Sequence, residues 1–167
     1  MSASFGKLLR RLADAKVEFI LVGGLAANAR GSARVTTDVD VSYGRSVANL
    51  ERLVKALAPI KPYLRGAPPG LPFDWSAATL RAGLNFTLTT TDGHLDLLGE
   101  IVGGGTYEDL VSHSTVERAF DRDIRVLDLQ ALIRAKRAAG RPKDLEVVAE
   151  LEALQEETAA NDRKHKR

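Results

Sequence analysis

Two aspartates separated by one valine are the residues of this chain whose spacing most suggests chemistry. Asp38 and Asp40 lie in "DVDV", which has the alternating pattern of a strand. Because side chains alternate between the faces of a strand, both carboxylates are expected on one face, with Val39 and Val41 pointing into the core. Carboxylates this close repel each other, so they either share a cation or lie on a solvated strand face.

A third aspartate repeats this arrangement later in the chain. Asp96 lies in "HLDLL", where Leu95 and Leu97 flank it on the other face. If the two strands are neighbours, three carboxylates converge on one patch of sheet, and such hard oxygen ligands suit Mg²⁺ or Mn²⁺. The alternative is that each acid is an ordinary surface residue, with Asp96 as half of a surface ion pair.

A pair of glycines precedes these acids at the end of an apolar run. Gly23 and Gly24 separate "VEFILV" from "LAANAR", which predicts a turn from a strand into a short helix. Glycine lets a phosphate approach the backbone, and the amides at the start of a helix attract anions. A tight turn without a phosphate is the alternative. An anion cradle joined to an acidic cation site provides the parts needed to hold a nucleoside triphosphate.

Composition excludes several classes of site. The chain has 167 residues, enough for one domain with a single core, and it has no cysteine, which excludes disulfides and thiolate chemistry. Its histidines, His94, His113 and His165, lack the spacing of metal ligands. Aromatic residues make up only 5%, which argues against binding single strands by base stacking. No apolar run is long enough for a membrane span, so we expect a cytoplasmic protein with no membrane partner.

The net charge is +2, but basic residues gather in the C-terminal part of the chain. A polyanion such as RNA or a nucleotide is compatible with this cluster but is not implied by it. The modest net charge and the lack of a helix-turn-helix pattern argue against a protein that reads a nucleic-acid sequence. The cluster consists of Arg134, Lys136, Arg137, Arg141 and Lys143.

Periodicity and turn residues predict the elements that position these groups. The basic, amphipathic N-terminus has its apolar residues at helical spacing, so we interpret it as a core-packing helix and not as a targeting segment. Helices are predicted over residues 4–16, 25–30, 47–57, 76–82, 128–139 and 142–157, with a further helix beginning at a capping box, Thr106 to Asp109. Strands are predicted over 17–22 and 38–43, with hairpins turning at 92–93 and 121–123.

These elements predict one domain over residues 1–157, with a core at about 17–100 and a C-terminal hairpin and helices at about 106–157. Residues 158–167 are predicted to be a basic flexible tail. Residues 59–73 hold five of the six prolines and are predicted to be a long loop, which is usually functional or mobile. Arg65 in this loop is placed to close over a nucleotide, although a loop arginine is more often solvated.

The order of these motifs resembles the DNA polymerase β-like nucleotidyltransferase superfamily. Its signature is a hydrophobic residue, Gly, then Gly or Ser, followed by Asp-x-Asp and by a third acid on a later strand, matched here by "LVGG", "DVDV" and "HLDLL". The segments "RVTTDVDV" and "LIRAKRAAGRPKDLEVVAEL" look like small bacterial members related to AbiEii-type toxin nucleotidyltransferases. The resemblance covers nearly the whole chain. It implies an α/β (α+β) fold with a mixed central β-sheet flanked by helices and with C-terminal helices.

The resemblance also implies roles for the residues of the motifs. Gly23 and Gly24 match the turn that contacts the phosphates, and Asp38 and Asp40 match the two metal ligands. Asp96 matches the third acid, which in the family lies near the acceptor hydroxyl and helps to activate it. All three acids are therefore predicted to be catalytic and to bind Mg²⁺ or Mn²⁺.

Further polar residues match the resemblance less specifically. Lys136 and Asp144 match polar positions of the C-terminal helices in the toxin-like group. Arg34 is a candidate phosphate contact, and Thr36 or Thr37 is a candidate for the hydroxyl that a Gly-Ser turn would supply; Thr37, Arg34 and Lys136 complete the predicted nucleotide site. For each of these residues the alternative is an ordinary solvated side chain, or strand propensity in the case of the threonines.

Two functions follow from this resemblance. The first is a Mg²⁺-dependent enzyme that transfers a nucleoside monophosphate from an NTP donor to a hydroxyl of RNA, such as tRNA, of a protein or of a small molecule, with an antitoxin or other partner protein if the chain is a toxin–antitoxin component. The second is a non-catalytic nucleotide-binding or protein-interaction module of the same fold. The glycine in place of serine favours the second function, and the retention of three acids favours the first.

Overall fold

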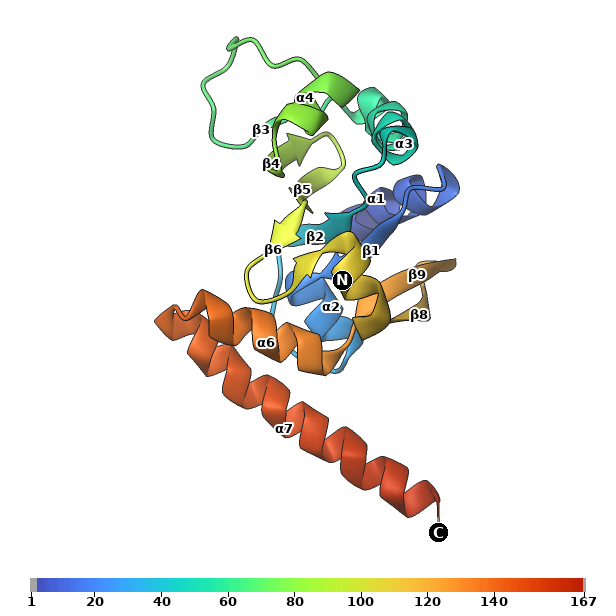
Figure 1. Cartoon of the computed structure of the whole chain (residues 1–167), viewed down its shortest axis with the longest axis vertical. Coiled ribbons are helices and arrows are strands. Elements are labelled where there is room, and N and C mark those ends of the chain that lie inside the picture. Colours follow the sequence, from blue (N-terminus) through green and yellow to red (C-terminus); the bar gives the residue numbers. More distant parts are fainter. Residues whose placement is uncertain (1–2, 167) are drawn as a thin grey trace.

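The computed structural model describes residues 3–166, and these residues form a mixed α/β fold around a seven-stranded sheet (Figure 1). The strands lie in the order β3-β4-β5-β2-β1-β9-β8. Their bounds are β1 Phe19–Val22, β2 Asp38–Tyr43, β3 Tyr63–Leu64, β4 Asn85–Thr90, β5 Gly93–Leu98, β8 Ser114–Ala119 and β9 Arg122–Leu127. A separate ribbon pairs β6 (Glu100–Ile101) with β7 (Gly105–Thr106). The structure therefore has the fold class that the sequence predicts, a mixed sheet flanked by helices.

Strand β2 lies at the middle of the sheet, where it pairs antiparallel with β1 and parallel with β5. Strands β4 and β5 form the hairpin predicted at Asp92–Gly93, and β8 and β9 form the second predicted hairpin, with its turn at Phe120–Asp121. The parallel pairing of β2 with β5 makes neighbours of the two strands that carry the three aspartates.

Helices cover both faces of this sheet. Their bounds are α1 Ala3–Asp14, α2 Gly23–Ala29, α3 Val47–Leu57, α4 Ala77–Ala82, α5 Tyr107–Leu110, α6 Leu129–Ala139 and α7 Pro142–His165. Helix α1 packs on the face that Leu95 occupies, because a Cβ added to Gly93 on that face would lie 3.8 Å from Leu8. Helix α6 lies over the opposite face, where Lys136 and Asp40 line one cavity.

The N-terminal segment is a core helix, as its periodicity predicts. Phe5, Leu8, Leu9 and Leu12 of α1 are all buried, at most 6% exposed. Burial of such a side chain contributes about 1.5–3 kcal/mol, so this face fixes α1 against the sheet. Helix α3 packs beside α1, begins at the Ser46 side chain, which accepts the Asn49 amide, and has the predicted bounds.

Three segments differ from the sequence predictions. Within 59–73, Tyr63–Leu64 forms the edge strand β3 beside β4, and a short 3-10 helix, η1, covers Ala58–Ile60 just before it. The glycines that lead into the capping box at Thr106 first turn the ribbon of β6 and β7, and α5 then begins as predicted. Helix α7 runs to His165, so the residues predicted as a flexible tail from 158 to 165 are helical. Local polarity indicates solvent exposure there but does not end a helix.

The ends of the C-terminal helices follow from particular residues. Asp128 caps α6 by accepting the Ala131 amide at 2.7 Å, and Gly140, with φ +67°, ends it in the left-handed conformation that glycine tolerates. Pro142 opens α7, as predicted. None of the helices within residues 3–166 is long and apolar enough to cross a membrane.

Candidate active site

The three predicted acids meet on one face of the sheet. Asp40 of β2 pairs in register with Asp96 of β5, and Asp38 lies two residues earlier on the same face. Val39 and Val41, which point to the other face, are fully buried. The alternation of acid and apolar residue therefore places carboxylates above the sheet and core side chains below it.

Asp40 lies against the glycine turn. Gly23 has φ +66°, and a Cβ added to it would lie 2.1 Å from Asp40 Oδ2. This separation is shorter than any non-bonded contact, so every other residue type at position 23 would displace the carboxylate as well as strain the backbone. Gly23 is therefore required by the neighbouring acid, whether or not a phosphate also lies there.

Thr36 occupies the space into which a side chain at position 24 would project, so this position needs a glycine. A Cβ at position 24 would lie 2.9 Å from Thr36 Oγ1 and 3.1 Å from its Cβ. A serine at this position would compete with Thr36 for the same space, so the Thr36 hydroxyl lies where the Gly-Ser form of the motif places its own side chain. Thr37 instead donates to Asp38 Oδ1 at 3.3 Å. Of the two threonines predicted as substitutes, Thr36 adjoins the turn and Thr37 adjoins the acids.

Crowding of the carboxylates changes the titration of Asp40. Burial first, and then the charge of Asp96, a hydrogen bond with Asp96 and the charge of Asp38, raise its pKa to about 7, while Lys136 opposes the shift. A carboxyl group that titrates near neutral pH beside other carboxylates indicates a site short of positive charge.

Arg65 supplies part of that charge. Its Nη2 donates to Asp96 Oδ1 at 2.8 Å, and its Nη1 lies 3.6 Å from Asp38 Oδ2. The same Nη2 donates to the Leu88 carbonyl at 2.7 Å, and the Arg65 backbone amide donates to the Thr87 carbonyl at 3.0 Å. The edge strand β3 thus holds Arg65 over the acids, so of the two alternatives given for this residue the solvated loop side chain is wrong.

His94 is a second neighbour of the acids that the sequence prediction missed. Its Nδ1 lies 3.2 Å from Asp38 Oδ1, and the two residues are paired across β2 and β5. The signal was present in the sequence, because His94 stands two residues before Asp96 and therefore shares its face. Metal-ligand spacing among the histidines was the wrong feature to test.

Two cavities adjoin Gly23 between the acidic face and α6. The larger, about 290 Å³, has Asp40 and Lys136 in its lining and is otherwise mainly apolar. Its size is near the lower end for ligand sites. The smaller, about 150 Å³, is bordered by four residues predicted to contact phosphate: Gly23, Gly24, Arg34 and Lys136. Four of the five residues predicted to contact the nucleotide thus line one cavity, whereas Thr37 does not, and the predicted metal ligand Asp40 lies beside it.

The two basic residues of the smaller cavity also pair with helix α7. Arg34 makes a two-pronged ion pair with Glu150, at 2.7 and 2.8 Å, which raises the pKa of Arg34. Lys136 Nζ lies 3.4 Å from Oδ1 of the buried Asp144. Arg141 first, and then Lys136, lower the pKa of Asp144 to about 2. Asp144 therefore holds the two C-terminal helices together and lies behind Lys136, away from the acids.

The three carboxylates have the chemistry that a divalent cation needs, but their present arrangement does not form a site for one. Asp38, Asp40 and Asp96 offer the hard oxygens that Mg²⁺ and Mn²⁺ prefer, and Arg65 already occupies this position as a cation. Within residues 3–166, no three acidic, histidine or cysteine side chains are grouped closely enough to hold a metal ion as they stand. The chemistry of the donor set therefore suits such an ion, while the position between Asp38 and Asp96 is taken by the guanidinium.

Comparisons with known proteins bear on the fold. No protein-family model and no curated protein matches the chain. A Thermotoga maritima protein proposed to be a nucleotidyltransferase, TM1012, superposes with a TM-score of 0.52 at 12% identity over 100% of this chain and 96% of its own. The lincosamide antibiotic adenylyltransferase LnuA, solved with lincomycin bound, gives 0.61 at 14% identity over 92% and 98%. The antibiotic-resistance factor ANT(2'')-Ia gives 0.50 at 18% identity over 99% and 98%.

The chain has the nucleotidyltransferase fold. This confirms the fold that the Gly-Gly turn and the spaced aspartates predict. The likeness extends over nearly the whole chain, including the C-terminal helices.

The raised pKa of Asp40 predicts how stability depends on pH. Below the ordinary carboxyl pKa, near 3.9, Asp40 is protonated in both the folded and the unfolded chain, so it has no effect on the free energy of unfolding. In the folded chain the pKa is about 7, and the stability that the retained proton gives relative to the ionised form is lost as the pH rises through that value. Asp40→Asn keeps the shape and the donor to Asp96. It should unfold at the same free energy as wild type near pH 4 and be more stable at pH 8, by up to a few kcal/mol at about 1.4 kcal/mol per pKa unit.

The measurement is urea denaturation of both proteins from pH 4 to pH 8 without divalent ions. Asp162→Asn, at an exposed position of α7, is the matched control and should follow wild type throughout. A stability difference between Asp40→Asn and wild type that stays constant with pH would contradict the assignment.

Proposed function

We propose that this chain transfers a nucleoside monophosphate from a nucleoside triphosphate to a hydroxyl acceptor. The observation that carries the proposal is the registered pair of Asp40 and Asp96 with Asp38 on the same face, beside cavities bordered by Gly23 and Lys136. The nucleotidyltransferase fold supports it.

The position of each residue assigns it a role in the transfer reaction. Asp96 accepts the proton of the acceptor hydroxyl, whose oxygen attacks the α-phosphorus; the bond from that phosphorus to the bridging oxygen breaks and pyrophosphate leaves. Gly23, Gly24 and Lys136 border the space for the departing phosphates. Asp38 and Asp40, with Asp96 beside them, would hold Mg²⁺ or Mn²⁺, which stabilises the charge on the attacking and leaving oxygens.

Arg65 must leave Asp96 before this proton transfer. Asp96 Oδ1 accepts a hydrogen bond from Arg65 at 2.8 Å, so the guanidinium occupies the oxygen that would receive the proton. Arg65 is a mobile counter-charge in this proposal, released from the acids when the divalent ion and the nucleotide enter.

The proposal also includes the chemical class of the acceptor. The resemblance to AbiEii-type toxins favours an RNA or protein hydroxyl and a role in a toxin–antitoxin pair. LnuA, which shares the fold, is an adenylyltransferase of a lincosamide antibiotic. The acceptor screen therefore includes RNA, protein and small hydroxylated compounds.

The first test is the activity of Asp38→Asn. We expect a thermal-shift titration with the four NTPs and Mg²⁺ to identify the donor, since a ligand at a hundred times its Kd stabilises a protein by about 2.7 kcal/mol. Transfer of α-phosphate label from that donor to the acceptor panel should fall by orders of magnitude in Asp38→Asn, because the substitution removes a metal-binding charge.

The melting temperature of Asp38→Asn without nucleotide should stay within a few degrees of wild type, since Arg65 retains Asp96 as a partner. Asp162→Asn again serves as the control, with full activity expected. Wild-type turnover in Asp38→Asn would eliminate the proposed role of this acid.

A second candidate function is a non-catalytic nucleotide-binding or interaction module. The observation that favours it is Arg65 itself, whose guanidinium takes a position suited to a divalent ion between Asp38 and Asp96. In a module of this kind the arginine would be a permanent part of the site.

Removal of Arg65 distinguishes the two functions. Arg65→Gln should melt at a lower temperature than wild type in EDTA, because the acids lose their counter-charge. Mg²⁺ should then raise its melting temperature more than it raises that of wild type, since no guanidinium has to be displaced. Arg81→Gln makes the same charge change at an exposed position of α4 and should show neither effect. If Mg²⁺ shifts neither protein while a nucleotide shifts both, the non-catalytic module is the better assignment.

A further inference from the structure

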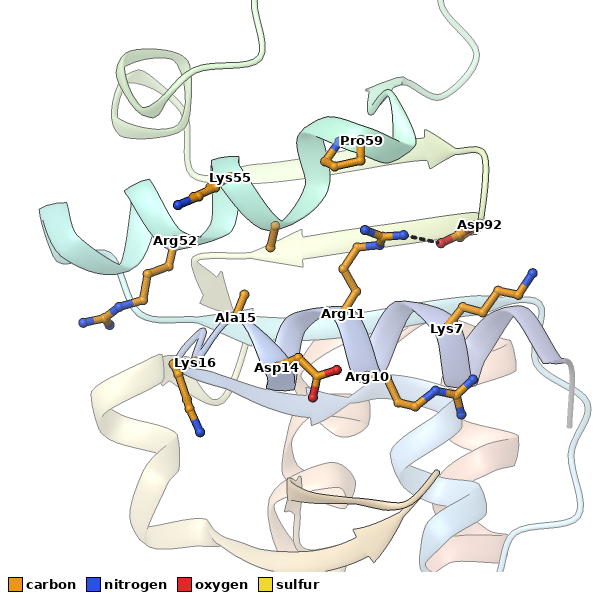
Figure 2. Close-up of a pocket in the computed structure, with 11 residues that line it drawn as sticks. Lys7, Arg10, Arg11, Asp14, Ala15, Lys16, Arg52, Lys55, Pro59 and Asp92 are labelled. Atoms are coloured by element: carbon orange, nitrogen blue, oxygen red, sulfur yellow. Dashed lines mark hydrogen bonds and ion pairs between the residues drawn. The ribbon is translucent and has the colours of Figure 1, made fainter.

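A groove between helices α1 and α3 concentrates positive charge on the side of the sheet away from the acids. It measures about 880 Å³, and Figure 2 shows basic side chains reaching into it from both helices. It shares no residue with the two cavities beside Gly23. Its cations are Lys7, Arg10, Arg11 and Lys16, from α1 and the turn after it, and Arg52 and Lys55 from α3.

The charge of this groove exceeds that of the whole protein. Six cations face two carboxylates, Asp14 and Asp92, which gives a net charge of +4, whereas the complete chain carries +2. The remainder of the chain is therefore negative by two charges. A positive region on an otherwise acidic molecule directs anions to one place.

The two carboxylates form ion pairs with only one of the six cations, although the charges of Lys16 and Arg10 also act on Asp14. Asp92 pairs with Arg11 at 3.4 Å (Figure 2), and Asp14 pairs at 2.6 Å with Arg122, which lies outside the groove. Within residues 3–166, the remaining five cations have no side-chain hydrogen bond or ion pair: Lys7, Arg10, Lys16, Arg52 and Lys55. Five unpaired cations around one groove leave its charge available to a ligand.

The lining favours phosphates over an acidic protein segment. Among residues 3–166, its only apolar members are Ala15, Ala56 and Pro59, too small to form the pockets that anchor a peptide. Arginine, present here on both helices, binds phosphate oxygens in a two-pronged geometry. No aromatic side chain of the part of the chain that the structure describes lines the groove, so these residues offer no platform on which single-stranded bases stack.

We propose that this groove binds the phosphodiester backbone of a nucleic-acid duplex without reading its sequence. On α1, Arg10 and Arg11 follow Lys7 by three and four residues, about 4.5–6 Å along the helix axis. A duplex strand offers one phosphate per about 3.4 Å of its axis, so several can be contacted at once. Since the groove lies apart from the acidic site, this proposal stands or falls separately from nucleotidyl transfer.

The test is fluorescence anisotropy of the full chain with a labelled 20-base-pair duplex, as RNA and as DNA of one sequence, from 50 to 200 mM salt. Five unpaired cations predict a slope of log K against log salt no steeper than about −4.5. Arg52→Gln/Lys55→Gln should weaken binding by roughly tenfold or more at 50 mM salt and reduce the slope by about 2. Lys7→Gln/Lys16→Gln is the second pair, should the first fail to fold.

The matched control is Lys164→Gln/Lys166→Gln, which removes the same charge from exposed residues near the end of α7 and should bind like wild type. Binding by either duplex that is lost only in the groove variants supports the proposal, and the preferred duplex identifies RNA or DNA as the source of the phosphates. Equal loss in the control would show attraction by overall charge and overturn it. Tighter binding of a poly-glutamate peptide than of both duplexes would also overturn it.

Discussion

The candidate active site depends on the repulsion of three carboxylates held on one face of two neighbouring strands. The sheet fixes the strands of Asp38, Asp40 and Asp96, so the acids cannot move apart to relieve it. The protein reduces this repulsion in two ways: Asp40 keeps its proton up to about neutral pH, and the Arg65 guanidinium bridges the other two acids. The edge strand β3 matters because it holds that guanidinium in place. Each of these features follows from a shortage of positive charge that a divalent ion would also relieve.

Sequence alone predicts the parts of this arrangement that depend on local pattern. Strand β2 and helix α3 have the predicted bounds because alternation and an amphipathic stripe are properties of consecutive residues. Asp96 was found by the same reasoning, which would have found His94 as well. Arg65 was named as a residue that could close over a nucleotide, but its contact with the acids could not be predicted. That contact depends on the pairing of a two-residue strand with β4, more than twenty residues away along the chain. Pairing over such a distance leaves almost no trace in a two-residue pattern.

Averages over the chain hid two further features. The net charge of +2 did not indicate the basic groove, because it averages over the whole chain. The groove forms only where two helices, separated in sequence by the first two strands, pack side by side. The basic N-terminal segment had been interpreted only as a core-packing helix. The Gly-Gly turn was also judged as a lost serine, whereas the space at Gly24 is taken by Thr36, twelve positions later. In each case residues distant in sequence complete a local feature.

The pairing of β2 also makes the acidic residues part of what specifies the fold. If β2 slipped by one residue against its partners, Asp38 and Asp40 would turn toward α1 and Val39 and Val41 would turn toward the cavity. Burying two carboxylates among leucines costs far more than the misplaced pairing itself, so the wrong alignment is excluded. The charges that crowd the correct fold therefore penalise its nearest competitor still more. A variant that replaced both aspartates with valine would relieve the repulsion and would lose the feature that distinguishes one face of the strand from the other.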